Sequence, residues 1–249
     1  CAAATAVFAL AWLFQAWVLT QPVWLAALAL GLFLKPMLAW AMLHDEVLAV
    51  EGALAESLAA GRAQLARLVS RDVTALSVES VRESAIESLG ENLNDSVVAP
   101  LFWFVVLGLP GAALFRFANT ADAMWGYRGE RGGRDWTWAG KWAARADDVL
   151  GWVPARITAV LIWLAGGLRG AGALAREARQ TPSPNSGWPM AAMALALGVR
   201  LGKPGAYTLN VDGRVPEAAD TLRACAIGSR SVVVATLACC AVIWWAVFV

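Results

Sequence analysis

Residues 1–34 contain no charged side chain, and this run restricts the fold more than any other part of the sequence. One helical crossing of a hydrocarbon core of about 30 Å needs about 20 residues, so the run is too long for a single crossing. Gln21 and Pro22 interrupt it, which predicts two helices, residues 1–20 and 23–43, joined as a hairpin. A signal peptide is not expected, because the run lacks a basic start and exceeds an apolar signal core in length. The chain begins without methionine, so we expect its native start to be missing.

The rest of the sequence is also apolar. Hydrophobic residues make up 59% of the chain, against about 45 to 50% in soluble domains. Three further runs, 96–115, 149–168 and 231–249, are each long enough to cross once, whereas 188–199 suits an interfacial or re-entrant helix. The sequence therefore predicts an all-α fold, a polytopic integral membrane bundle with about four to five membrane segments, one of them re-entrant, and amphipathic interfacial helices.

We expect one membrane-embedded domain over residues 1–249, divided into five parts. They are a helical hairpin (1–43), an acidic amphipathic helical segment (44–95), a core motif region (96–168), a polar loop holding the short helix 188–199 (169–230), and a C-terminal transmembrane helix (231–249). The net charge of +1 conceals an acidic excess in the second part and a basic excess in the fourth. A near-neutral chain of this kind is not expected to bind nucleic acid.

Polar groups gather at both ends of the run 96–115, where lipid would penalise them. On a regular helix Glu87, Glu91 and Asp95 lie four residues apart and form one stripe of carboxylates, which repel one another unless a cation lies among them. The Asn92 side chain adds a neutral oxygen suited to a hard divalent ion. The alternative is that these groups only cap helices and form surface ion pairs.

A second polar group follows the run, with Asn119 and Asp122 three residues apart and then Tyr127, Arg128 and Arg131. The planar guanidinium of arginine suits phosphate. If 96–115 crossed the membrane, the two polar groups would lie on opposite faces. A turn at residues 108–111 would bring them together, and we favour this turn because broken backbone is tolerated where it lines a protein cavity.

Several common kinds of site are excluded by the residues present. His44 is the single histidine, which rules out a histidine-based triad or a multi-histidine metal site. The four cysteines have no zinc-site spacing. The Gly-Lys pair at Lys203 lacks the spacing of a P-loop. A nucleotide would therefore be held by carboxylate-bound magnesium and by arginines. Arg156, flanked by apolar residues, is expected to point into the same cavity or, alternatively, to reach the membrane interface.

Four motifs carry a family resemblance. ENLNDSVVAPLFW, NTADAMWGYRGER, the ARADD of residues 144–148 with its downstream WVPAR, and SPNSGWP occur in this order. Over roughly residues 35–205 the chain resembles the cobinamide-phosphate synthase family of membrane proteins from cobalamin biosynthesis. The resemblance implies a ligase of the bacterial cytoplasmic (inner) membrane that uses ATP and Mg²⁺. It would join adenosylcobyric acid to aminopropanol or its phosphate, giving adenosylcobinamide or its phosphate. Expected partners are these substrates, the lipid bilayer, a second copy of the chain, and other corrinoid-assembly enzymes.

This reaction suggests roles for the polar residues. A carboxylate must be activated, most simply as an acyl phosphate, before an amine attacks it, which calls for magnesium, phosphate clamps and an oxyanion stabiliser. We expect Glu91, Asp95 and Asp122 to bind magnesium, and Tyr127, Arg128 and Arg131 to bind the nucleotide. The expected catalytic residues are Asp147 or Asp148 as the base, with Asn92, Asn119, Asn185 and Arg156 orienting the substrates.

The chain departs from the pattern of the family at several positions, two of which flank the SPNSGWP motif. Thr181 stands where His is expected, and Met190 stands where Glu is expected. Two non-enzymatic alternatives stay open, a membrane sensor or regulator on the same scaffold and a corrinoid carrier or transporter. Binding of ATP separates the ligase from both.

Overall fold

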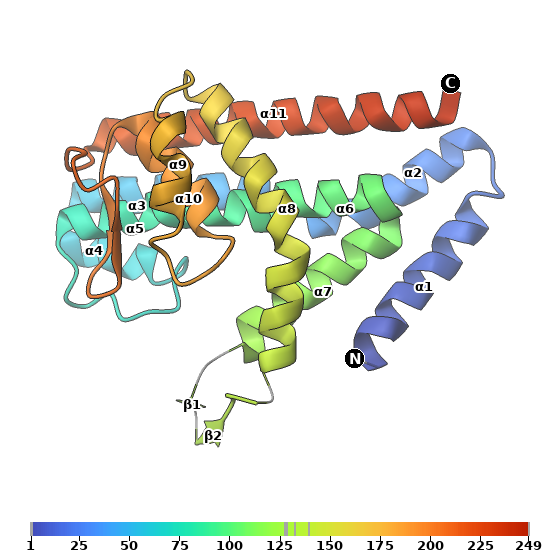
Figure 1. The fold of residues 1–249 in the computed structure, drawn as a ribbon, viewed down its shortest axis with the longest axis horizontal. Coiled ribbons are helices and arrows are strands. Elements are labelled where there is room, and N and C mark those ends of the chain that lie inside the picture. The colour runs from blue at the N-terminus through green and yellow to red at the C-terminus, as the bar shows by residue number, and fades with distance from the viewer. Residues whose placement is uncertain (1, 127–128, 132, 139, 249) are drawn as a thin grey trace. The chain divides into compact units, whose positions relative to one another are not determined.

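The computed structural model describes residues 2–126, 129–131, 133–138 and 140–248, and the side chains of Arg131, Arg134 and Phe248 lie outside that description. The protein is mostly helical, as predicted (Figure 1). It divides into two compact units: unit 1 comprises Cys1–Ala39, Asp95–Pro154 and Thr236–Val249, and unit 2 comprises Trp40–Asn94 and Ala155–Ala235. Each unit is assembled from segments far apart along the chain, and the predicted division of one domain into consecutive parts stays a prediction.

Unit 1 contains most of the apolar helices. Its elements are α1 (Ala2–Val18), α2 (Val23–Leu34), the 3-10 turn η1 (Lys35–Met37), α6 (Ala99–Leu107), α7 (Leu109–Trp125), and the antiparallel strands β1 (Glu130–Arg131) and β2 (Arg134–Asp135). The second helix of the predicted hairpin ends at Leu34, earlier than expected. Pro36 lacks the N–H that a continuing helix needs, and Leu38 is extended.

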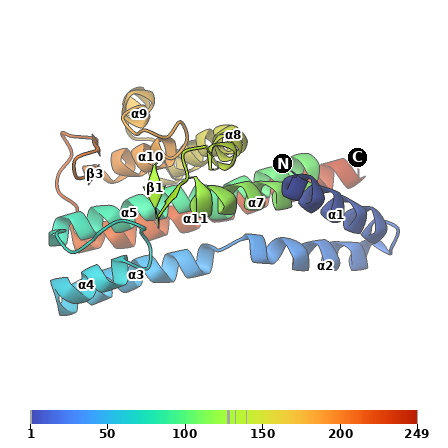
Figure 2. The ribbon, with the colours of Figure 1, turned by 90° about the horizontal axis from the view of Figure 1, so that it is seen from below.

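Unit 2 contains further helices and one small hairpin. Its elements are α3 (Trp40–Glu56), α4 (Leu58–Leu65), α5 (Val78–Leu93), α9 (Ala171–Ala178), α10 (Gly187–Leu197), β3 (Leu201–Lys203) and β4 (Tyr207–Leu209). Figure 2 shows α4 beside α3, and α5 packs against both of these helices. Helices α8 (Lys141–Ala165) and α11 (Ala218–Phe248) contribute residues to both units, and the π-helical turn η2 (Asn94–Val98) begins where α5 ends.

Three helical segments are long and apolar enough to cross a membrane: Val23–Glu56, Lys141–Ala165 and Ala218–Val247. They contain or overlap the predicted segments 23–43, 149–168 and 231–249. The predicted short helix 188–199 is present as α10. These features agree with a polytopic helical membrane protein, and α1 is a further apolar helix of 17 residues.

The run 96–115 is not one helix but turns back at Gly108, as the sequence suggested. Gly108 has a φ of +70°, a conformation that favours glycine, and it separates α6 from α7. The side chain of Gln15 from α1 satisfies the new helix start, because its Oε1 accepts a hydrogen bond from the Leu109 main-chain N–H at 2.7 Å. A Cβ on Gly108 would collide with this Gln15 amide. The break therefore depends on both residues.

A second helix interruption in unit 1 is satisfied in a similar way. Pro154 lies inside α8 and has no N–H to donate to the carbonyl of Leu150, four residues earlier. The indole Nε1 of Trp103 on α6 donates to this carbonyl at 2.9 Å. The hydrogen bond that proline removes from the helix is thus replaced by a side chain of a neighbouring helix.

Helix α5, the framework of unit 2, is polar in sequence but largely buried. It begins at Ser77, whose side chain accepts a hydrogen bond from the main-chain N–H of Ser80 at 3.2 Å. Val81, Ile86 and Leu89 are fully buried, and α3, α10 and β3 pack against the helix. Because these elements cover it, Glu83, Ser84, Glu87 and Ser88 are buried inside unit 2, whereas Glu79 in the first turn of α5 is exposed.

Candidate functional site

The first group of candidate residues is a carboxylate cluster in unit 1, which we call the Asp95–Asp147 cluster. It consists of Asp95, Asn119, Asp122, Asp147 and Asp148. The Asn119 amide Nδ2 donates to Asp95 Oδ2 at 3.2 Å and to Asp147 Oδ1 at 3.1 Å, and so joins residues from η2, α7 and α8. The carboxylates of Asp95, Asp122 and Asp148 all act electrostatically on that of Asp147. The cluster is thus rich in negative charge and is ordered by one neutral amide.

The turn at Gly108 explains why the cluster forms. It reverses the chain, so that Asn119 on α7 returns to Asp95 at the start of the reversed segment. Arg116, one helical turn before Asn119, donates from Nη1 to the main-chain oxygen of Asp95 at 3.2 Å. The turn thus brings Asp95 of the first predicted polar group to Asn119 of the second, whereas Glu87 and Glu91 of the first group lie in unit 2.

The predicted magnesium trio is not gathered as a closed site. Among the residues that the structure describes, no three His, Cys, Asp or Glu side chains are arranged to hold a metal ion. The predicted stripe of Glu87, Glu91 and Asp95 assumed a regular helix, but α5 ends at Leu93 and the π-helical turn η2 changes the residue spacing from there. Glu87 and Glu91 instead line a pocket of unit 2.

Two predicted catalytic residues meet in unit 2. The Arg156 guanidinium donates from Nη1 to Asn185 Oδ1 and from Nη2 to the main-chain oxygen of Pro184, both at 3.0 Å. It also lies over the Trp188 ring, 4.7 Å from its centroid. Arg156 therefore holds the SPNSGWP segment, and its predicted place in the cavity of the two polar groups stays a prediction.

Three predicted nucleotide ligands cannot be placed. Tyr127 and Arg128 lie outside the described residues, as does the side chain of Arg131. Their assignment to the nucleotide stays a prediction.

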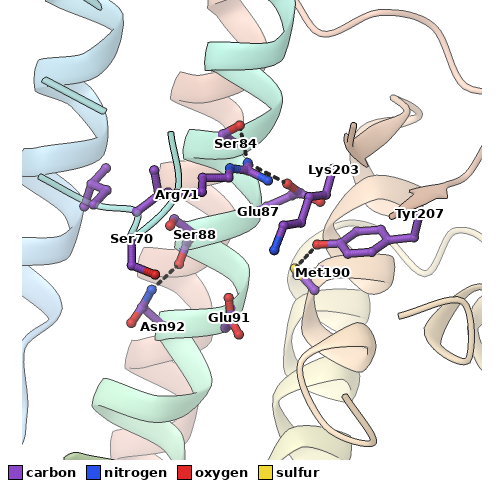
Figure 3. A pocket seen from close by; sticks show the side chains of 12 residues that line it. Ser70, Arg71, Ser84, Glu87, Ser88, Glu91, Asn92, Met190, Lys203 and Tyr207 are labelled. Atoms are coloured by element: carbon purple, nitrogen blue, oxygen red, sulfur yellow. Dashed lines mark hydrogen bonds and ion pairs between the residues drawn. The ribbon is translucent and has the colours of Figure 1, made fainter. Parts of the chain in front are cut away.

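The second group of candidate residues lines a cavity of about 190 Å³ in unit 2, which we call the Arg71–Glu87 pocket (Figure 3). Its walls come from α5, the segment before it, α10 and the β3–β4 hairpin. The polar lining residues are Ser70, Arg71, Ser84, Glu87, Ser88, Glu91, Asn92, Lys203 and Tyr207, and Met190 adds a thioether. Lys203 and Tyr207 are paired across the hairpin, so one turn places both on the same wall.

Charges of both signs lie close together in this pocket. Arg71 Nη2 is 3.5 Å from Glu87 Oε2 and also donates to the Ser84 hydroxyl. Burial disfavours the charged form of Glu87 and raises its pKa to about 7, although Arg71 acts in the opposite direction. Burial and the neighbouring Glu87 carboxylate also raise the pKa of the Tyr207 hydroxyl. Tyr207 therefore stays a hydrogen-bond donor at neutral pH.

Two buried atoms of the pocket are not satisfied by the protein. Within the described part of the chain, neither Glu87 Oε1 nor Arg71 Nε has a hydrogen-bond partner. The Glu87 side chain is only 5% exposed, so water contact is small. A buried acceptor and a buried donor without protein partners are costly, so water or a ligand in the cavity must supply their hydrogen bonds.

The sequence pointed to only part of this pocket. Glu91 and Asn92 were predicted as site residues, although the Asn92 amide donates to the Ser88 main-chain oxygen at 2.9 Å. Arg71 and Tyr207 were missed, and Lys203 was considered only as a P-loop lysine. The available signal was the repeat of Ser84, Glu87, Ser88 and Glu91 at helical spacing on a helix that also carries buried apolar residues.

Comparison with known proteins gives a consistent family. The family model described as "CobD/Cbib protein" matches residues 1–246. A protein of Methanothermobacter thermautotrophicus named probable cobalamin biosynthesis protein CobD is 48% identical over 185 residues, 72% of this chain and 61% of that protein. A Pyrococcus abyssi protein of the same name is 47% identical over 169 residues, 68% of this chain and 55% of that protein. Cobalamin biosynthesis protein CobD of Rhodobacter capsulatus is 40% identical over 225 residues, 86% of this chain and 70% of that protein.

The chain spans 61% and 55% of the length of the archaeal relatives. No solved structure matches it. The family model covers almost the whole sequence, and the relatives share at least 40% of their aligned residues with it. This chain therefore belongs to the CobD/CbiB family of cobalamin biosynthesis proteins.

Proposed function

We propose that this protein forms an amide bond between adenosylcobyric acid and aminopropanol phosphate or aminopropanol, using ATP, at the bacterial cytoplasmic membrane. Family membership supports a place in cobalamin biosynthesis and an enzymatic role. The observation that carries the finer proposal is the meeting of Asp95, Asn119 and Asp147, from three separate helical segments, in one acidic cluster.

The cluster fits magnesium with ATP. Magnesium in proteins usually keeps several waters and binds through one or two carboxylates together with the phosphates of its substrate, so a cage of three carboxylates is not required. Asp95 and Asp147 would supply the carboxylates, and the Asn119 amide holds both in place. When bound, the metal neutralises charge on the phosphates during transfer. Arg128 and Arg131 would bind the phosphate oxygens.

The remaining residues of the cluster suit the proton transfer. Phosphoryl transfer to the corrinoid carboxylate gives an acyl phosphate, the amine attacks its carbonyl carbon, and phosphate leaves. The attacking amine must lose a proton, and Asp148, next to Asp147 on α8, would accept it. Asp122 contributes negative charge beside Asp148 that favours protonation of the base.

The test is an assay of the purified protein in detergent with magnesium, ATP, adenosylcobyric acid and aminopropanol phosphate. We expect an amide-linked corrinoid product that requires every component, with ATP consumed in proportion. Corrinoid binding without ATP binding or product would support a carrier or regulator and would overturn the ligase.

A further inference from the structure

The Arg71–Glu87 pocket has the charges and the size of a binding site for a small molecule. At about 30 Å³ for each water, its 190 Å³ corresponds to about six water molecules. Pockets for larger ligands are about 300 to 1,000 Å³, so this cavity does not by itself enclose a nucleotide or a corrinoid ring. A compact ligand with several polar groups fits it.

The unsatisfied atoms define what the ligand must offer. Glu87 Oε1 is an acceptor that needs a donor, whereas Arg71 Nε is a donor that needs an acceptor. A simple anion would satisfy Arg71 and leave Glu87 unpaired, and a simple amine would do the reverse. A ligand carrying both an anionic group and an ammonium group satisfies both atoms.

The surrounding charges divide in the same way. Figure 3 shows the Lys203 side chain reaching between Glu87 and Tyr207, so that it adds a second cation to Arg71. Glu91 lies one helical turn beyond Glu87 on α5 and lines the same cavity. The pocket thus offers two cations for one group of a ligand and carboxylates for another.

We propose that the Arg71–Glu87 pocket binds a small zwitterion, with its anionic group against Arg71 and Lys203 and its ammonium against Glu87 and the neighbouring Glu91. Identification of this zwitterion as the amine substrate, aminopropanol phosphate, rests on the proposed function. The Tyr207 hydroxyl would then donate to the anionic group in preference to the Met190 thioether, a weak acceptor 3.8 Å away.

The experiment is calorimetric titration of the full chain in detergent, without ATP or corrinoid, using aminopropanol phosphate, propyl phosphate and aminopropanol as probes. We expect aminopropanol phosphate to bind at least about tenfold more tightly than either partial probe, because each of those leaves a buried charged group unpaired. Equal affinity for propyl phosphate and aminopropanol phosphate would overturn the zwitterion site.

Variants locate the binding. Lys203→Gln should lower the affinity for propyl phosphate and for aminopropanol phosphate about tenfold and leave the affinity for aminopropanol unchanged. Glu91→Gln should lower the affinity only for the two probes that carry an amine. Arg67→Gln and Glu79→Gln are the matched controls, because Arg67 pairs with Glu46 outside the pocket and Glu79 is exposed on α5. Lys203 is exposed on β3, so its replacement is not expected to unfold the protein. Unchanged affinities in both pocket variants would place the ligand elsewhere.

Failure of this inference is distinguishable from failure of the ligase. If the probes bind and both variants change their affinities as expected, but no amide product forms, the zwitterion pocket is supported and the proposed ligase activity is rejected. Product formation by Lys203→Gln and Glu91→Gln with an unchanged KM for the amine would retain the ligase and remove the pocket.

Discussion

The Asp95–Asp147 cluster of unit 1 depends on interrupted helices, whereas the Arg71–Glu87 pocket of unit 2 is built on a helix that stays regular. In unit 1 the chain reverses at Gly108 and α8 contains Pro154, and neighbouring side chains satisfy the backbone at both places. In unit 2 the side chains of α5 recur at helical spacing along one wall. The same chain thus positions one polar group by breaking helices and the other by preserving one.

The two groups also differ in charge. The Asp95–Asp147 cluster collects groups of one sign around a neutral amide, which suits a cation. The Arg71–Glu87 pocket pairs opposite signs, which suits a ligand with two charges. These differences can be tested by changing one residue of the cluster or the pocket and measuring both turnover and the binding of aminopropanol phosphate.

The largest effect is expected for Asp95→Asn, which removes a carboxylate from the cluster. Magnesium-dependent turnover should fall at least about a hundredfold, because the amide replaces an anionic ligand with a neutral one. Binding of aminopropanol phosphate in unit 2 should stay unchanged. Asp212→Asn, in an exposed loop, is the control. Turnover close to that of the wild type would remove Asp95 from the metal site.

Gly108→Ala tests whether the cluster needs the chain reversal. The φ of +70° and the Gln15 side chain both oppose a Cβ, so we expect a loss of about 2 to 3 kcal/mol in the free energy of unfolding, together with reduced turnover. Gly31→Ala on α2 is the control, because a Cβ there meets nothing within 4 Å. Thermal unfolding of both variants in detergent measures the effect, and equal stability would show that the break tolerates a side chain.

Glu87→Gln tests the pocket through pH. The pKa of Glu87 is about 7 in the folded protein and about 4.5 when unfolded, so only the unfolded state releases its proton as pH rises from about 4.5. The stabilising contribution of protonated Glu87 is complete below about pH 4.5 and is lost as pH approaches about 7.

In Glu87→Gln this part of the pH dependence should disappear, so its melting temperature should vary less between pH 4.5 and 7 than that of the wild type. Exposed Glu56→Gln should keep the wild-type slope. Parallel curves for Glu87→Gln and the wild type would show that Glu87 does not titrate in this range.

Trp103→Phe should have the smallest effect, about 1 to 2 kcal/mol, because it leaves the Leu150 carbonyl without its indole donor. In a Pro154→Ala background the helix regains an N–H at position 154, so the same change should cost less there. The free energy of unfolding of the wild type, the two single variants and the double variant measures the coupling between the two positions. Additive effects would show that the Trp103 indole does not replace the hydrogen bond that Pro154 removes.

The sequence predicted the helical class, the chain reversal and all five residues of the Asp95–Asp147 cluster, because charge patterns and glycine-proline breaks are visible in short stretches of sequence. Asp95, Asn119 and Asp147 stood out as polar groups beside apolar runs. The π-helical turn could not be foreseen, since Asn94–Val98 carries no residue that demands it, and it redirected the expected carboxylate stripe. Arg71 and Tyr207 were missed because they reach the pocket from a loop and a short hairpin, whose positions depend on tertiary packing.

The replacement of the hydrogen bond lost at Pro154 by the Trp103 indole also limits how related sequences can diverge at these two positions. While position 154 is proline, position 103 is expected to keep an uncharged hydrogen-bond donor for the Leu150 carbonyl, which the Trp103 indole supplies on a large apolar ring. Once proline is lost, position 103 is free to become any apolar residue. The two positions are therefore expected to change together across the family, although they are 51 residues apart in the sequence.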